Sequence, residues 1–118
     1  MLVLICGDRN WTDKQAIERE FIRHGLNPIR DIIMHGAARG ADSLAGQIGK
    51  AHGFQVRSYP AQWDTYGRAA GPIRNNLMLD QNPDLVLAFH PNINISKGTG
   101  HMVKIARAKG TETEVFNA

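Results

Sequence analysis

Cysteine is nearly absent from this chain, and long hydrophobic runs are lacking. The 118 residues contain one cysteine, Cys6, which excludes an intramolecular disulfide and suits a reducing compartment. No apolar run is long enough to cross a bilayer. The apolar opening segment, residues 1–6, lacks the basic stretch that begins a secretion signal. We therefore expect a cytoplasmic protein that has no membrane partner.

A strong charge of either sign is also missing. Lys and Arg number 14 against 11 for Asp and Glu, a formal net charge of +3. This slight excess favours partners that carry phosphate, but it is too small to indicate DNA. Blocks of like charge, low-complexity segments and internal repeats are absent too. The length then predicts one domain over residues 1–118.

The residue patterns of metal sites and nucleophilic enzymes are not found. The five histidines are His24, His35, His52, His90 and His101. Neither an H-x-x-x-H spacing nor a pairing with cysteine occurs among them, so we expect no metal and no cofactor. No Ser-His-Asp order or G-x-S-x-G elbow is present. A lone cysteine in an apolar strand is typical of an inert core residue.

Five short apolar runs alternate with stretches of helical periodicity. The predicted strands are residues 2–6, 32–35, 54–59, 85–89 and 114–116. The first helix is expected to begin at Thr12, because residues 12–15 match a capping box. Further helices are predicted over 42–50, after Gly71-Pro72 and over 99–110. The third of these four helices should bury Ile73 and Leu77, and residues 60–68 should form the longest non-helical loop.

Nearly all-apolar strands that alternate with helices indicate a parallel sheet with helices on both faces. The chain is thus predicted to be a small α/β protein with a Rossmann-like, doubly wound sheet. Right-handed crossovers and a reversal of winding after the third strand predict the strand order 3-2-1-4-5. The ligand crevice should then lie at the carboxyl ends of the first and fourth strands. Residues 7–11, 36–42 and 90–100 would meet there.

Two glycine-containing turns precede helices at this edge of the sheet. One holds Gly36 and Gly40, and the other is Gly98-Thr99-Gly100. Free N–H groups and the positive end of a helix dipole suit a phosphate. The second turn has neither the Walker A order nor a dinucleotide fingerprint. We expect it to be the principal phosphate seat, although glycines at such junctions also serve the turn alone.

Charged side chains follow the predicted strands into the crevice. Gly7 leads into Asp8 and Arg9, and Arg39 lies in the next loop, where each guanidinium can grip a phosphate through two hydrogen bonds. Asp42 is placed either to cap the second helix or to accept hydrogen bonds from a ribose or a catalytic water.

Three more candidates lie in and after the long loop of residues 60–68. Trp63 could stack on a base or close one side of the core. Arg74 and Asn75 fall in the first turn of the third helix, from which they can point back to the crevice.

Five segments, spread in order along the chain, together resemble a known family. They are Gly7-Asp8-Arg9, residues 35–42, residues 60–63, residues 66–75 and Gly98-Thr99-Gly100. Together they look like the YspA/YpsA-related branch of the SLOG superfamily, which also holds the Lonely-guy phosphoribohydrolases and the DNA-processing protein A family. The resemblance implies a Rossmann-like sheet that binds a nucleotide or nucleotide-derived ligand. It also implies a possible homodimer.

One departure from the Lonely-guy enzymes bears on chemistry. Those enzymes carry Arg-Lys-x-x-Met and Pro-Gly-Gly-x-Gly-Thr-x-x-Glu motifs. Residues 74–78 keep the arginine and the methionine of the first, but Met102 stands where the second places its glutamate. The resemblance therefore favours a sensor or binding module over an enzyme.

In this leading hypothesis the phosphate rests on Gly98-Thr99-Gly100, Arg9, Arg39 and Arg74, and the base or ribose lies near Trp63 and Asp42. An alternative is hydrolysis of the N-glycosidic bond of a nucleotide, with Asp8, Asp42 or Arg74 as catalytic candidates. A second alternative is single-stranded DNA binding, which would need a continuous basic groove with stacking aromatics. Nucleic acid is thus a possible partner but not the favoured one.

Overall fold

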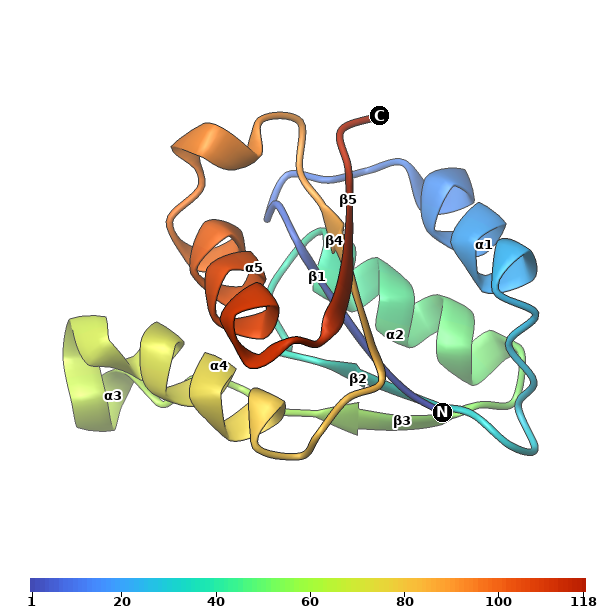
Figure 1. Cartoon of the computed structure of the whole chain (residues 1–118), viewed down its shortest axis with the longest axis horizontal. Coiled ribbons are helices and arrows are strands. Elements are labelled where there is room, and N and C mark those ends of the chain that lie inside the picture. The colour runs from blue at the N-terminus through green and yellow to red at the C-terminus, as the bar shows by residue number, and fades with distance from the viewer.

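Five parallel strands form one sheet in the order β3-β2-β1-β4-β5 in the computed structural model, which describes residues 1–118 (Figure 1). The strands are β1 (Leu2–Gly7), β2 (Ile32–His35), β3 (Gln55–Ser58), β4 (Leu85–Phe89) and β5 (Glu112–Phe116). The predicted α/β class and strand order are confirmed. All five predicted strands are present, although β5 begins two residues earlier than expected.

Helices cover both faces of this sheet, as Figure 1 shows. The helices α1 (Lys14–Arg23) and α2 (Ala41–Ala51) lie on one face, and α4 (Ala70–Leu79) and α5 (Gly98–Lys109) lie on the other. Shorter turns are α3 (Trp63–Tyr66), η1 (Gly67–Ala69) and η2 (Ile93–Ile95). None of the helices combines the length and hydropathy that a membrane-crossing segment requires.

The central strand β1 supplies both halves of the core because its side chains alternate between the two faces. Val3 and Ile5 belong to the apolar cluster beneath α1 and α2. Leu4 and Cys6 belong to the cluster beneath α4 and α5. A strand that is buried on both faces is apolar at nearly every position, which is why β1 reads as a continuous hydrophobic run.

The first helix begins later than the capping-box pattern predicts. Asp13, not Thr12, is the N-cap residue, and its carboxylate accepts a hydrogen bond from the Ala16 N–H at 3.1 Å. The Trp11 indole N–H donates to the Asp13 carbonyl at 2.9 Å. The buried Trp11 thus holds Asp13 in place, and the helix begins one residue later than predicted. Ile17 and Phe21 are buried as expected.

The helix α4 turns a different face to the core from the one predicted. Ile73 and Leu77 were expected to be buried, but they are 43% and 49% exposed. Met78 and Leu79 pack into the core instead, and Asn75 is buried with them. The helix takes this orientation because its inward face carries polar side chains that bond to neighbouring loops, which apolar periodicity does not detect.

The segment predicted as the longest non-helical loop, residues 60–68, is partly helical. It contains α3 and most of η1, and η1 begins directly after α3 at Gly67, whose φ is +54°. This left-handed conformation is open to glycine at little cost, so the chain can end one helical turn and begin another. Trp63 and Tyr66 remain about half exposed on this segment.

We predict that Gly7→Ala destabilises the protein. An added Cβ would overlap the backbone oxygen of Phe89 and lie 2.6 Å from the Ala41 Cβ, and the same Phe89 oxygen accepts the Asp8 N–H at 2.8 Å. Because backbone and a packed helix cannot move aside cheaply, we expect a loss of about 1–3 kcal/mol in the free energy of unfolding.

Urea denaturation of both variants checks this, with Gly98→Ala as the control. A Cβ at Gly98 meets nothing within 4 Å, and alanine is the better helix former. Equal denaturation midpoints for Gly7→Ala and the wild type would contradict the prediction.

Candidate functional site

A cavity of about 1070 Å³ opens at the carboxyl ends of β1 and β4, at the upper end of the volumes usual for small-molecule sites. It lies where the winding of the sheet reverses, since β1 leads to α1 on one face and β4 leads to α5 on the other. Four segments line it, one after each of β1, β2, β3 and β4.

The loop between β2 and α2 uses its backbone N–H groups internally. One carboxylate oxygen of Asp42, Oδ2, accepts the N–H of Gly36 at 2.9 Å and the N–H of Ala38 at 3.2 Å. The Ala37 N–H donates to Nδ1 of His35 at 2.9 Å. This glycine turn therefore offers an anion few free donors, although its sequence resembles a phosphate cradle.

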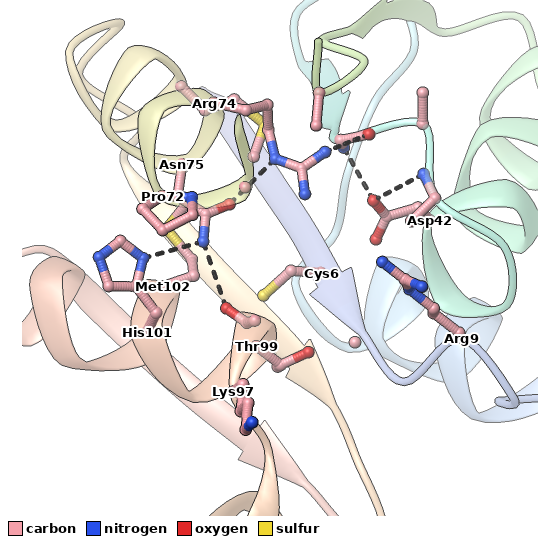
Figure 2. Close-up of a pocket in the computed structure, with 18 of the residues that line it drawn as sticks. Cys6, Arg9, Asp42, Pro72, Arg74, Asn75, Lys97, Thr99, His101 and Met102 are labelled. Atoms are coloured by element: carbon pink, nitrogen blue, oxygen red, sulfur yellow. Dashed lines mark hydrogen bonds between the residues drawn. The ribbon is translucent and has the colours of Figure 1, made fainter. Parts of the chain in front are cut away.

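Asp42 does not cap α2, contrary to the capping alternative. The N-cap residue is Gly40, with φ +73°, and Asp42 lies inside the first turn. Asp42 is 4% exposed and lines the cavity, with Oδ1 making no hydrogen bond in the structure (Figure 2). Burial raises the pKa of Asp42 to about 6, opposed by its two backbone hydrogen bonds and by Arg74.

A polar network on α4 forms the facing wall. Arg74 Nη1 donates to the carbonyl of Gly36 and, at 3.3 Å, to that of Tyr59, while Nε donates to Asn75 Oδ1 at 3.0 Å. Burial lowers the pKa of the Arg74 guanidinium, and Asp42 counteracts this effect. Arg74 Nη2 makes no hydrogen bond within the chain and is an available donor.

Asn75 joins this network to the start of α5. Its Nδ2 donates to the Gly98 carbonyl at 3.2 Å and to His101 Nδ1 at 3.1 Å. Since Oδ1 is already an acceptor for Arg74, the amide orientation is set by both neighbours. Figure 2 shows Asn75 between Arg74 and Thr99, and the buried amide thus fixes the position of the α5 N-terminus relative to α4.

The N-terminus of α5 is the donor-rich part of the cavity. The N–H groups of Gly98 and Thr99 have no acceptor within the chain, whereas the Gly100 N–H donates to Ser96 Oγ at 3.1 Å. Lys97 is the N-cap residue and lines the cavity. Free N–H groups, a helix dipole and an ammonium group at one place suit an anion.

Cationic side chains outnumber carboxylates around the cavity. Asp8 and Asp42 are the acidic side chains, and the basic ones are Arg9, Arg39, Arg68, Arg74 and Lys97. The Arg9 guanidinium lies 5.9 Å from the centre of the Trp63 ring, a cation–π distance. The loop after β1 therefore contacts α3 at the mouth of the cavity.

Comparison with known proteins assigns a family to a chain with this fold and cavity. A model of the YspA, cpYpsA-related SLOG family matches residues 1–66. This chain belongs to that family. The gene 61 protein of Mycobacterium phage D29 is 34% identical to it over an alignment of 117 residues, and the match covers 92% of this chain and 90% of the phage protein. No solved structure matches the chain.

Most of the predicted site residues of this SLOG-family chain line the cavity described above. Those that line it are Gly7, Asp8, Arg9, Gly36, Arg39, Asp42, Trp63, Arg74, Asn75, Gly98 and Thr99. Gly40 and Gly100 do not. The φ of +73° and the close approach of the Asp8 carbonyl explain the glycine at position 40, and the Gly100 N–H is bonded to Ser96.

Several lining residues were not among the predicted ones. They include Cys6, Pro60, Arg68, Lys97, His90 and His101. Lys97 stands directly before the predicted phosphate turn, and this adjacency is a signal that could have identified it. Cys6 lines the cavity as a buried thiol whose pKa is raised by burial and by Asp42, which agrees with its interpretation as an unreactive core residue.

One cluster of possible metal ligands lies elsewhere, although histidine spacing did not indicate it. Ligand atoms of Glu20, His24 and Glu114 lie within 4.8 Å of one another. Arg23 already occupies this cluster, because its Nε donates to Glu20 at 2.6 Å and its Nη2 donates to Glu114. The group is an ion-pair cluster that joins α1 to β5.

We predict that Asp42→Asn changes the pH dependence of stability. The folded-state pKa of about 6 exceeds the ordinary value of 3.8, so the folded wild type binds the proton more tightly than the unfolded chain. The stability that protonation contributes is complete below about pH 4 and is lost as the pH rises through 6. The variant should therefore gain about 1–3 kcal/mol relative to wild type between pH 4 and pH 7.

Urea denaturation of both proteins at several pH values measures this difference. The remaining titrating groups are shared, so they largely cancel. Asparagine can keep the hydrogen bonds to Gly36 and Ala38 through its carbonyl oxygen, which preserves the loop. If the unfolding free energies of the two proteins change in parallel from pH 4 to pH 7, the pKa of Asp42 is not raised in the folded state and the prediction is wrong.

Proposed function

We propose that this chain is a binding module for a nucleotide or nucleotide-derived small molecule. The observation that carries the proposal is the convergence of the two free N–H groups of α5 with five basic side chains on one cavity. Family membership supports the proposal, because the SLOG resemblance implies ligands derived from nucleotides. The cavity volume of about 1070 Å³ is ample for such a molecule.

The phosphate would rest at the α5 N-terminus. Gly98 and Thr99 would donate their N–H groups, and Lys97 would add a positive charge. Arg9, Arg39 and the free Nη2 of Arg74 would hold further phosphate oxygens from the other side. The exposed ring of Trp63 offers a surface on which a base can stack.

A second candidate function is hydrolysis of the bond between ribose and base. It is favoured by the buried carboxylate of Asp42, whose unbonded Oδ1 and pKa of about 6 suit a general base. Against it, α5 contributes Met102 to the cavity where a Lonely-guy enzyme would place a glutamate. Binding without turnover therefore stands as the principal proposal.

A thermal-shift screen of nucleoside mono- and diphosphates tests the binding proposal, since a ligand that binds only the folded state raises the melting temperature. We expect at least one nucleotide to raise it and to bind less tightly as salt is added. Lys97→Gln should weaken the affinity about three- to tenfold, because an exposed cation next to a phosphate contributes modestly.

Lys104→Gln is the matched control. It removes the same charge from an exposed position within α5 that does not line the cavity. Equal losses in the two variants would indicate a general charge effect and not a phosphate seat. If no nucleotide at millimolar concentration raises the melting temperature, the binding proposal is wrong.

Chromatography of the same mixtures separates the two candidate functions. Intact nucleotide after prolonged incubation supports a binding module. Free base that accumulates with wild type, and not with Asp42→Asn, would establish the hydrolase.

A further inference from the structure

One carboxylate oxygen that faces the cavity makes no hydrogen bond within the chain. Asp42 is 4% exposed, and both of its hydrogen bonds go to Oδ2. The ion pairs of the chain all lie elsewhere. Because Asp42 is a buried residue that lines the cavity, its unbonded Oδ1 can be reached only from within the cavity, where it is suited to receive a hydrogen bond from a bound molecule.

The charges around Asp42 limit what that donor can be. A cationic group would meet repulsion from the basic side chains of the cavity, among them Arg9 and Arg74. A phosphate oxygen would be repelled by the carboxylate itself and has no proton to donate when ionised. A neutral donor satisfies both conditions, and a hydroxyl group is the simplest one.

The ligand must also reach the donor-rich end of α5. Figure 2 shows Asp42 on one side of Cys6, with Thr99 and Lys97 on the other. A sugar phosphate can meet both requirements, because it carries an anion at one end and hydroxyl groups a few bonds away. Trp63, which is half exposed, offers the base a stacking surface without need of Asp42.

We propose that Asp42 Oδ1 accepts a hydrogen bond from a ribose hydroxyl, so that the site selects ribonucleotides over deoxyribonucleotides. This inference rests on the proposed function and narrows its ligand class. It assigns separate roles to the two oxygens of one carboxylate: Oδ2 holds the loop after β2, and Oδ1 binds the ribose hydroxyl.

Isothermal titration of the full chain at neutral pH tests the inference. The probes are nucleoside monophosphates with their 2′-deoxy and 3′-deoxy counterparts, together with ribose 5-phosphate and 2-deoxyribose 5-phosphate, which carry no base. We expect loss of at least one hydroxyl to weaken binding about tenfold or more, as is usual for a hydrogen bond to a charged group. Asp42→Asn should reduce this preference to a few-fold at most, because the hydroxyl then meets a neutral amide nitrogen in place of the charged acceptor Oδ1.

Asp8→Asn is the matched charge control. Asp8 also lines the cavity, and asparagine can keep its hydrogen bond to the Asn10 N–H. This variant should tighten ribo and deoxy ligands alike and leave their ratio unchanged. A ratio that changes equally in both variants would mean that net charge, not Asp42, sets the preference, and would overturn the inference.

The wild-type ratios test the inference even if Asp42→Asn does not fold. Equal binding of every ribo and deoxy pair would overturn the sugar assignment and leave the proposed function intact. A preference that depends on the base, and that is absent between ribose 5-phosphate and 2-deoxyribose 5-phosphate, would also overturn the sugar assignment and leave the proposed function intact. Failure of every probe to bind would instead overturn the proposed function itself.

Discussion

The parallel pairing of β1 with β4 is the constraint on which this structure depends. The pairing brings Gly7 opposite Phe89 at the carboxyl end of both strands. From there the chain leaves toward α1 on one face and toward α5 on the other. Because the two loops diverge, the edge of the sheet stays open between them, and the loops after β2 and β3 close the sides. The cavity thus follows from strand order before any particular side chain is considered.

Asp42 links this architecture to the chemistry of the cavity. Its Oδ2 bonds hold Gly36 and Ala38 in place, and the Gly36 carbonyl in turn accepts from Arg74 on α4. The carboxylate on one face of the sheet and the guanidinium from the other therefore meet through one loop. Burial of the carboxylate costs stability, which its raised pKa expresses. The hydrogen bonds from the Gly36 and Ala38 N–H groups offset part of that cost.

Sequence patterns predict the sheet better than they predict the helix faces. Apolar strands that alternate with helices indicate a parallel sheet, and right-handed crossovers with one reversal of winding then leave few strand orders. The orientation of α4 depends on Arg74 and Asn75, which are drawn inward by carbonyl groups of Gly36, Tyr59 and Gly98. These partners are distant in the sequence, so periodicity of Ile73 and Leu77 pointed to the wrong face. Sequence periodicity likewise does not reveal that Asp42 holds the loop after β2, because its hydrogen bonds to Gly36 and Ala38 depend on the folded shape of that loop.

Two glycine turns that look alike in sequence differ in their free donors. After β2, the N–H groups of Gly36, Ala37 and Ala38 are bonded to Asp42 and His35. Before α5, the N–H groups of Gly98 and Thr99 remain free. The difference arises because the first turn encloses a carboxylate that takes up its donors, and the second does not. One wall of the cavity consequently offers an acceptor and the opposite wall offers donors, and this polarity would orient a ligand that carries both kinds of group.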